Sequence, residues 1–197
     1  MSAMPSDGQL VDQLQSGDLA VLGLLYERHN TSVYRTALAI TRDPAAAEDI
    51  RQDCFIRIYE RAHLIDSSRP LAPWLYRVTV NLAYNWARRK KRSPAQLDGL
   101  DGVTDWLTNP LQRSPEQQAE MSDARSEMMD AISTLSINQR IAVILFYLNA
   151  LNVKEIAAIL GCPVGTVKSR LYYGRENLRQ KLGAKHKRPT EMAYTFA

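Results

Sequence analysis

The residues best suited to specific contacts lie near the C-terminal end, in the stretch EIAAILGCPVGTVKSRLYYGRENL. Gly161 can adopt the left-handed conformation that ends a helix, and Pro163 suits the first position of the next one. A helix beginning at Pro163 would bury an apolar stripe at spacings of three and four. The positions left outside that stripe offer a cation, hydroxyls and aromatic edges, at Thr166, Lys168, Ser169, Tyr172 and Tyr173.

A short helix, a sharp turn and this second helix together predict a helix-turn-helix. Near the start of such a recognition helix, cations, hydroxyls and tyrosine edges can meet base edges in the major groove of DNA. A solvated helix in an ordinary α-hairpin is the alternative that spacing alone leaves open. Asn152 with Glu155 three residues later predicts a capping box for the first helix, and Ser136 predicts the N-cap of the helix before it.

Composition limits the classes of protein to which the chain can belong. It has 197 residues, 45% of them apolar, which is enough to bury a core in one domain or two small ones. The formal charge of +4 permits a polyanionic partner without requiring one. The longest strongly apolar run, 141–148, is far shorter than the roughly 20 residues of a membrane span. Acidic Asp7 and Asp12 are unlike a signal peptide, so a cytoplasmic protein without membrane insertion is expected.

The apolar residues follow a helical period almost throughout, and no stretch alternates strictly, so the predicted fold class is all-α. One stripe runs along residues 22–38. The dipeptide Asp43-Pro44 predicts the cap and first turn of a helix that buries Ile50 and Cys54. A further helix is expected to begin at Trp74 and to end in the basic run at 88–92.

Composition also divides the chain into two small helical domains. Residues 93–125 contain three prolines and six acidic residues against two basic ones, which predicts a flexible acidic linker with little regular structure. The second domain, of about sixty residues, is within the size range that folds alone. The predicted boundaries are 1–92 for the first domain, 93–120 for the linker, 121–182 for the second domain and 183–197 for a loose tail.

Chemistry belonging to the chain itself is hard to find. The sequence contains no glycine-rich phosphate loop, no paired histidine motif and no nucleophile with a recognisable base. His29, His63 and His186 share no metal-ligand spacing. Cys54 and Cys162 lie in helical or helix-flanking patterns, which predicts two reduced thiols. We therefore expect no catalytic residue, no metal and no cofactor, and a protein that is not an enzyme.

Three stretches resemble bacterial sigma factors of the extracytoplasmic function (ECF) group. EIAAILGCPVGTVKSRL is similar to region 4, the helix-turn-helix domain that binds the minus-35 promoter element. AAAEDIRQDCFIRIYERA resembles region 2.2, and RPLAPWLYRVTVNLAYNWARRKKR resembles regions 2.3 and 2.4. The resemblance covers about 19–92 and 121–182 and implies a sigma region 2 domain followed by a sigma region 4 domain. It further implies a factor that binds core RNA polymerase, recognises both promoter elements and promotes strand opening.

The resemblance assigns roles to residues of the first domain. Region 2.2 contacts the clamp helices of the polymerase β′ subunit, and the corresponding residues are Asp49, Gln52 and Asp53; a plain solvated face is the alternative. The loop between the two region 2 helices captures unpaired minus-10 bases, and its pocket wall corresponds to Ile65, Asp66, Ser67, Ser68 and Arg69. Asn81 is the expected base-edge contact. The strand or phosphate contacts expected on the same side are Arg77, Asn85 and Arg88.

In the second domain, the resemblance implies that Lys168, Ser169, Tyr172 and Tyr173 face the minus-35 bases, with Thr166 near the DNA backbone. The implied partners are core RNA polymerase, through the β′ clamp helices and the β subunit, and promoter DNA. An anti-sigma factor is also implied, so the protein would be associated with the nucleoid or held at the membrane through that partner. The acidic linker would thread the polymerase cleft toward the RNA exit path.

Two other classes of function remain open at this point. One is an autonomous repressor or activator, with a similar helix-turn-helix and an N-terminal sensing domain. The stretches RQDCF and PWLYRVTVNLAYNW argue against it, because a sensor has no need of them. The other is an enzyme fused to a DNA-binding module, and turnover by the isolated first domain would support it.

Overall fold

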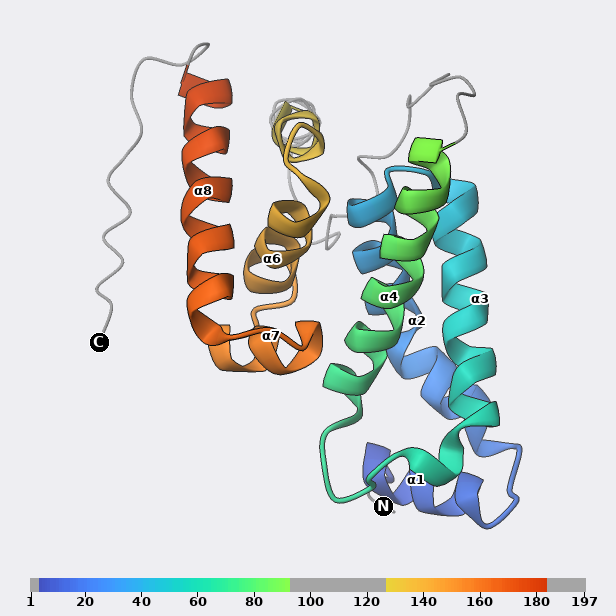
Figure 1. Ribbon diagram of the computed structural model, residues 1–197. Coiled ribbons are helices and arrows are strands. Elements are labelled where there is room, and N and C mark those ends of the chain that lie inside the picture. The colour runs from blue at the N-terminus through green and yellow to red at the C-terminus, as the bar shows by residue number, and fades with distance from the viewer. Residues whose placement is uncertain (1–3, 93–126, 184–197) are drawn as a thin grey trace, which may run out of the picture.

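The computed structural model describes residues 4–92 and 127–183, and the regular secondary structure of these two ranges is entirely helical. The all-α fold class predicted from the apolar period is thereby confirmed. The predicted linker and all of the predicted tail except Gly183 lie outside the described residues. The first range forms α1 (Asp7–Gln15), α2 (Val21–Thr41), α3 (Pro44–Glu60), the 3-10 turn η1 (Ala62–Leu64) and α4 (Leu71–Arg92) (Figure 1).

Local capping fixes where α3 begins. The Asp43 carboxylate accepts a hydrogen bond from the Ala46 amide at 3.0 Å, and Pro44 occupies the first helical turn. Arg42, just before the cap, adopts a left-handed conformation with φ 55°, which ends α2 and reverses the chain. The helix start predicted from Asp43-Pro44 is therefore confirmed.

Helix α4 begins at Leu71, earlier than the predicted start at Trp74. Pro73 does not prevent the earlier start, because an amide in the first helical turn has no intrahelical partner to lose. Leu71 and Leu75 are buried, whereas Trp74 is half-buried at the edge of the core. The extra turn therefore adds a fully buried leucine to the helix.

Helices α2, α3 and α4 enclose one apolar core. Half of the stripe predicted on α2 is buried and its other members are half-buried, whereas the stripe predicted on α3 is wholly buried. Burial of each large aliphatic side chain stabilises the fold by about 1.5–3 kcal/mol, far more than an exposed ion pair does. The buried residues that α2 and α3 contribute include Leu25, Val33, Ala37, Leu38, Ala47, Ile50, Cys54 and Ile58.

The second range begins in helical residues 127–133 and continues through α6 (Ile137–Tyr147), α7 (Val153–Leu160) and α8 (Val164–Gly183). Ser136 and Asn152 cap α6 and α7, and each cap is a complete capping box. Gly161 ends α7 in the left-handed conformation, with φ 60° and ψ 39°. The predicted helix-turn-helix is thus confirmed. The predicted N-caps Ser136 and Asn152 and the predicted helix end at Gly161 are confirmed as well.

Helix α8 lies so close to α6 that one position must be glycine. A Cβ atom on Gly174 would lie 2.9 Å from Cγ2 of Val143. Gly174 is buried together with Val167 and Leu171, which form the stripe predicted on the inner side of α8. That packing fixes the opposite side of α8 as the exposed one.

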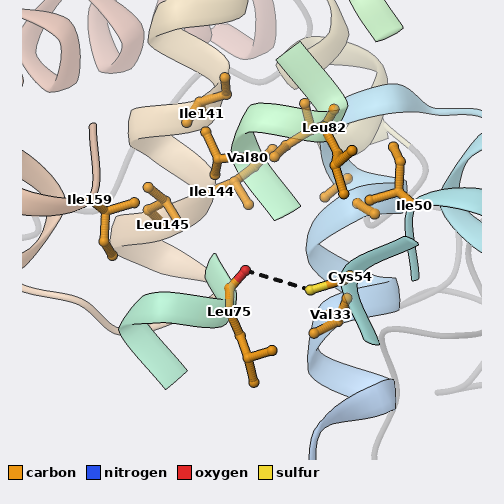
Figure 2. Packing of buried hydrophobic residues seen from close by; sticks show 14 of the residues in the cluster. Val33, Ile50, Cys54, Leu75, Val80, Leu82, Ile141, Ile144, Leu145 and Ile159 are labelled. Atoms are coloured by element: carbon orange, nitrogen blue, oxygen red, sulfur yellow. Dashed lines mark hydrogen bonds between the residues drawn. The ribbon is translucent and has the colours of Figure 1, made fainter. Parts of the chain in front are cut away.

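The two halves of the chain share a single core, an arrangement that the sequence did not predict. Val80 of α4 lies beside Ile141 and Ile144 of α6, whereas Leu82 lies on the side of α4 that faces Ile50 of α3 (Figure 2). Polar contacts cross the same boundary. Arg140 donates to the carbonyl of Ile40 at 2.9 Å, Asn149 donates to the Thr36 hydroxyl at 2.9 Å, and Arg42 pairs with Asp130 at 2.6 Å.

Candidate nucleic-acid interfaces

The outer face of α8 carries the residues expected to read DNA. Tyr172 and Tyr173 are 60% and 58% exposed, and their rings meet edge to face at 5.3 Å. Lys168 and Ser169 are exposed beside them, and Thr166 is half-buried at the helix start. The Ser169 hydroxyl donates to the Gly165 carbonyl at 3.0 Å, so its oxygen remains available to accept from a base amino group. This face therefore combines a cation, a hydrogen-bond acceptor and two aromatic edges.

A second polar stripe lies along α4. Arg77, Asn81, Asn85 and Arg88 are all exposed, and their spacing of three or four residues places them on one side of the helix. The opposite side of α4 is buried through Leu75 and Ala83. Among the described residues, neither asparagine amide has a side-chain hydrogen-bond partner, so each can both donate to and accept from a ligand.

The loop between η1 and α4 turns sharply around Asp66. Its Oδ1 accepts from the Ser68 amide at 3.0 Å and from the Ser68 hydroxyl at 2.5 Å, and its Oδ2 lies 3.0 Å from Nε of Arg69. The Ser68 hydroxyl and amide, and then the charge of Arg69, hold the pKa of Asp66 below its ordinary value. The carboxylate is therefore ionised near neutral pH and keeps the turn closed.

The five residues predicted as a pocket wall do not all lie at the surface. Asp66, Ser68 and Arg69 are exposed and Ser67 is half-buried. Ile65, in contrast, is only 5% exposed and belongs to the core. The loop thus presents polar side chains outward while its apolar residue anchors it.

The three residues predicted to contact polymerase lie on one exposed side of α3. Asp49, Gln52 and Asp53 face outward, opposite the buried Ile50 and Cys54. The same side continues through Ile56 and Tyr59, which are 52% and 53% exposed. These two residues were not predicted from the sequence, although their helical spacing from Asp49 and Gln52 places them on the same side of α3. Large apolar side chains that gather on one exposed side, tyrosine among them, are typical of a protein-binding surface.

Arg51 explains how α3 packs against α2 beside this surface. Its guanidinium lies over the rings of Tyr26 and Tyr34, 5.6 and 5.4 Å from their centroids, and pairs with Glu48. A cation between two aromatic faces is attracted by both ring quadrupoles. Arg51 is therefore a packing residue, half-buried beside the exposed carboxylates.

The basic end of α4 is only partly available to a ligand. Arg88, Arg89 and Lys90 are exposed. Lys90, however, lies 3.2 Å from the Asp43 carboxylate and 4.6 Å from the ring centroid of Trp86. Burial alone would raise the pKa of Asp43, but the Ala46 amide and the Lys90 ammonium outweigh it and lower that pKa.

The remaining groups that could do chemistry are dispersed. Cys54 is buried next to Thr79, and desolvation raises the pKa of its thiol to about 11, so it stays protonated at neutral pH. Both Cys54 and Cys162 are free thiols. Within residues 4–92 and 127–183, no group of histidine, cysteine and carboxylate side chains could hold a metal ion. No helix in those two ranges has the length and apolar character needed to cross a membrane.

A helix-turn-helix whose second helix exposes a cation, a hydroxyl and two tyrosines is typical of a DNA-binding protein, and comparison with known proteins identifies the family. The family model Sigma-70 region 2 matches residues 25–93, and the model Sigma-70, region 4 matches residues 125–178. The ECF RNA polymerase sigma factor SigW of Bacillus subtilis is 30% identical over 176 residues, which cover 87% of this chain and 94% of SigW. SigL of Mycobacterium tuberculosis H37Rv is 33% identical over 172 residues, with 85% and 94% covered.

A third relative is similar in sequence, and two solved structures are similar in fold. The ECF sigma-E factor of Escherichia coli K12 is 30% identical over 188 residues, covering 92% of this chain and 97% of that protein. CnrH in complex with the cytosolic domain of CnrY has a TM-score of 0.66 at 22% identity, with 92% and 100% covered. RpoE bound to the anti-sigma factor NepR, from Bartonella quintana, has a TM-score of 0.61 at 22% identity, with 83% and 98% covered. The two structures support the shared fold.

The chain belongs to the ECF sigma factors of bacterial RNA polymerase. Its function is accordingly promoter recognition together with RNA polymerase, and the family consists of initiation factors rather than catalytic enzymes. The roles of individual residues on α3, α4 and α8 stay predictions.

Proposed function

We propose that three exposed helix faces divide the work of transcription initiation. The α3 face holds the polymerase, the α4 stripe with its preceding loop holds unpaired minus-10 DNA, and the outer α8 face reads the minus-35 duplex. One observation supports this division above all others. On each of the three helices, one side is exposed and the opposite side is buried. The exposed sides carry Asp49, Gln52 and Asp53 on α3, Arg77, Asn81, Asn85 and Arg88 on α4, and Lys168, Ser169, Tyr172 and Tyr173 on α8.

The chemistry of each face suits its proposed ligand. Asn81 can donate to and accept from the Watson–Crick edge of an unstacked base, which a duplex would hide. Arg77 and Arg88 supply positive charge for a strand backbone. On α8, Lys168 and the two tyrosines suit a major groove, where lysine contacts guanine and apolar groups contact the thymine methyl.

The polymerase surface combines charge with apolar area. Asp49 and Asp53 would steer the encounter with a basic partner, because exposed charges act mainly on association rate. Ile56 and Tyr59 lie on the same side and would supply apolar burial once contact is made. We place the β′ clamp helices on this surface.

The finer features of the family are proposed by analogy. The chain would carry out no reaction of its own, since bond formation belongs to the polymerase. It would act in the cytoplasm and be held inactive by an anti-sigma factor. Support for such a partner comes from RpoE of Bartonella quintana, which was solved bound to the anti-sigma factor NepR.

Run-off transcription with added core polymerase on a random promoter library tests the proposal directly. We expect transcripts from a subset of templates that share two sequence elements at a fixed separation. Asn81→Ala should lower the permanganate reactivity of melted thymines while the protein still co-elutes with core polymerase. Failure to bind the polymerase, or binding that never directs initiation, would refute the proposal.

A further inference from the structure

Helix α1 contacts the loop that follows η1 and holds the loop backbone in place. Loops that connect helices are ordinarily the most mobile part of a domain, and a mobile loop is a poor receptor for a single base. Here the backbone of residues 62–67 lies against α1, a helix that was not predicted from the sequence.

The first contact is made by Gln15, the last residue of α1. Its Nε2 amide donates one hydrogen bond to the carbonyl of Ala62 and another to the carbonyl of Ile65, both at 2.9 Å. A glutamine amide has two protons, so both are used. Carbonyls at the end of a helical turn lack intrahelical partners, and Gln15 supplies that partner for Ile65, the residue that ends η1.

The second contact is made by Gly8, at the opposite end of α1. A Cβ atom on Gly8 would lie 2.3 Å from the carbonyl oxygen of Ser67, closer than two such atoms can approach. Only glycine therefore lets the helix lie directly on the loop backbone. At a rise of 1.5 Å per residue, Gly8 and Gln15 contact the loop at points about 10 Å apart along α1.

Helix α1 is itself firmly attached and can serve as a rigid support. Leu10 and Val11 are buried in the shared core. Asp7 pairs with Arg28 at 2.5 Å and with His29 at 2.8 Å, and both of these partners belong to α2. A capping box at Ser6 completes the helix start. The loop therefore cannot move away from its position unless α1 also moves relative to α2.

We propose that α1 positions the base-capture loop, with Gln15 and Gly8 holding residues 65–69 in the conformation that receives an unstacked minus-10 base. The inference rests on the proposed function, which assigns that pocket to the loop. The backbone carbonyls are held inward by α1, while Asp66, Ser68 and Arg69 point outward. Gln15 and Gly8 are positioning residues that do not themselves touch DNA, and they lower the ordering entropy that binding would otherwise require.

Four variants of the full chain, assembled with core polymerase, test the proposal. Gln15→Met removes both donors at nearly constant length, and Gly8→Ala introduces the clashing Cβ. The matched controls are Gln13→Met, on an exposed position of the same helix, and Gly23→Ala, where a Cβ meets nothing within 4 Å. We expect Gln15→Met to open promoters about tenfold more slowly, which corresponds to the loss of one to two net hydrogen bonds. Gly8→Ala should also slow opening, because its Cβ displaces the loop backbone, and both controls should be unchanged.

Rescue variants at position 15 distinguish a loss of loop positioning from a loss of overall protein stability. Gln15→Lys restores donors and should recover opening, whereas Gln15→Glu, with the same shape and no donor, should not. Gln13→Lys controls for the added charge. Thr36→Val, which removes a buried hydrogen bond at the join with α6, should leave opening unchanged when assayed below its melting temperature. Loss of opening in Thr36→Val equal to that in Gln15→Met would overturn the proposal.

Hydrogen exchange supplies a readout that does not depend on promoter opening. Hydrogen exchange at the Ile65 and Arg69 amides should quicken in Gln15→Met, because their partners at Ala62 and Asp66 lose support. Unchanged exchange would contradict the positioning role. Normal opening in Gln15→Met alongside impaired opening in Asn81→Ala would overturn this inference alone. Normal opening in both would overturn the minus-10 assignment as well.

Discussion

The side chain of Asn149 donates a hydrogen bond to the Thr36 hydroxyl at 2.9 Å, across 113 positions of the chain and from one half of the protein to the other. Thr36 is fully buried, and its own proton is donated to the Ser32 carbonyl at 2.8 Å. Its oxygen is therefore oriented to accept from Asn149. The two halves are joined by a directional polar contact as well as by apolar packing.

Replacement of that hydroxyl by a methyl group, in Thr36→Val, preserves side-chain shape and removes the acceptor. We expect the free energy of unfolding to fall by about 1–3 kcal/mol, because the Asn149 amide would lose its buried partner. Urea unfolding followed by circular dichroism measures the loss. In a double-mutant cycle with Asn149→Ala, the two losses should be less than additive. Strict additivity would show that the contact contributes nothing.

Gly174→Ala should destabilise the protein even though alanine favours helices. The new Cβ would lie 2.9 Å from Cγ2 of Val143, and overpacking of this kind costs about 1–3 kcal/mol, against roughly 1 kcal/mol gained in helix propensity. Thermal melting should show a lower midpoint, and Val143→Ala should restore part of it. Gly165→Ala, where a Cβ meets nothing within 4 Å, is the matched control and should be neutral or stabilising. Equal midpoints for the two glycine variants would exclude a steric effect.

The Asp43 carboxylate should make stability depend on acid pH. Its pKa is lowered in the fold, so its contribution is fully present above the ordinary carboxyl pKa near 4 and is lost as pH falls through the lowered value. Asp43→Asn keeps a capping acceptor and removes the charge that pairs with Lys90. The difference in unfolding free energy between the two proteins should therefore shrink as the pH is lowered. A constant difference across that pH range would rule out the linkage.

Lys168→Ala should weaken promoter selection by about 1–3 kcal/mol, the range for a good base contact. The measurement is transcription from templates that differ only in the minus-35 element. Lys154→Ala removes the same charge from an exposed position on α7 and should affect all templates alike. If Lys168→Ala leaves the order of preference among templates unchanged, Lys168 does not read bases.

Asp49→Lys should abolish co-elution with core polymerase, because it reverses a charge on the exposed side of α3. Asp12→Lys makes the same change on the exposed side of α1 and should co-elute normally. Retention of Asp49→Lys in the complex would refute the assignment of this surface. Circular dichroism of both variants establishes that each is folded.

Local features of the fold were predictable because their causes lie within a few residues of each other. The Asp43-Pro44 start, the Asn152 capping box and the Gly161 turn each depend on one side chain and its nearest amides. The buried stripes of α2, α3 and α8 follow from spacing alone. The exposed sides of α3 and α8 are those opposite the buried stripes, so the exposure of the candidate site residues could be predicted, whereas their roles stay predictions.

Other features could not be predicted, since they depend on which surfaces meet. Nothing in the sequence indicates that Asn149 reaches Thr36, or that Gln15 reaches Ala62 and Ile65. Helix α1 itself was missed for a different reason, because its signal was present. Ser6 with Gln9 forms a capping box just before Leu10, and a search for that pattern would have found it.

Helix α2 contributes side chains to the packing of α3 and α4 and also to that of α6. Removal of either half would therefore strip apolar cover from the same helix and raise the free energy of the half left behind. We therefore expect the two halves to unfold together in a single cooperative transition, which coincident unfolding curves from two different probes would show. A damaging substitution in the half that contains α6, α7 and α8 should consequently also destabilise the half that contains α1 to α4.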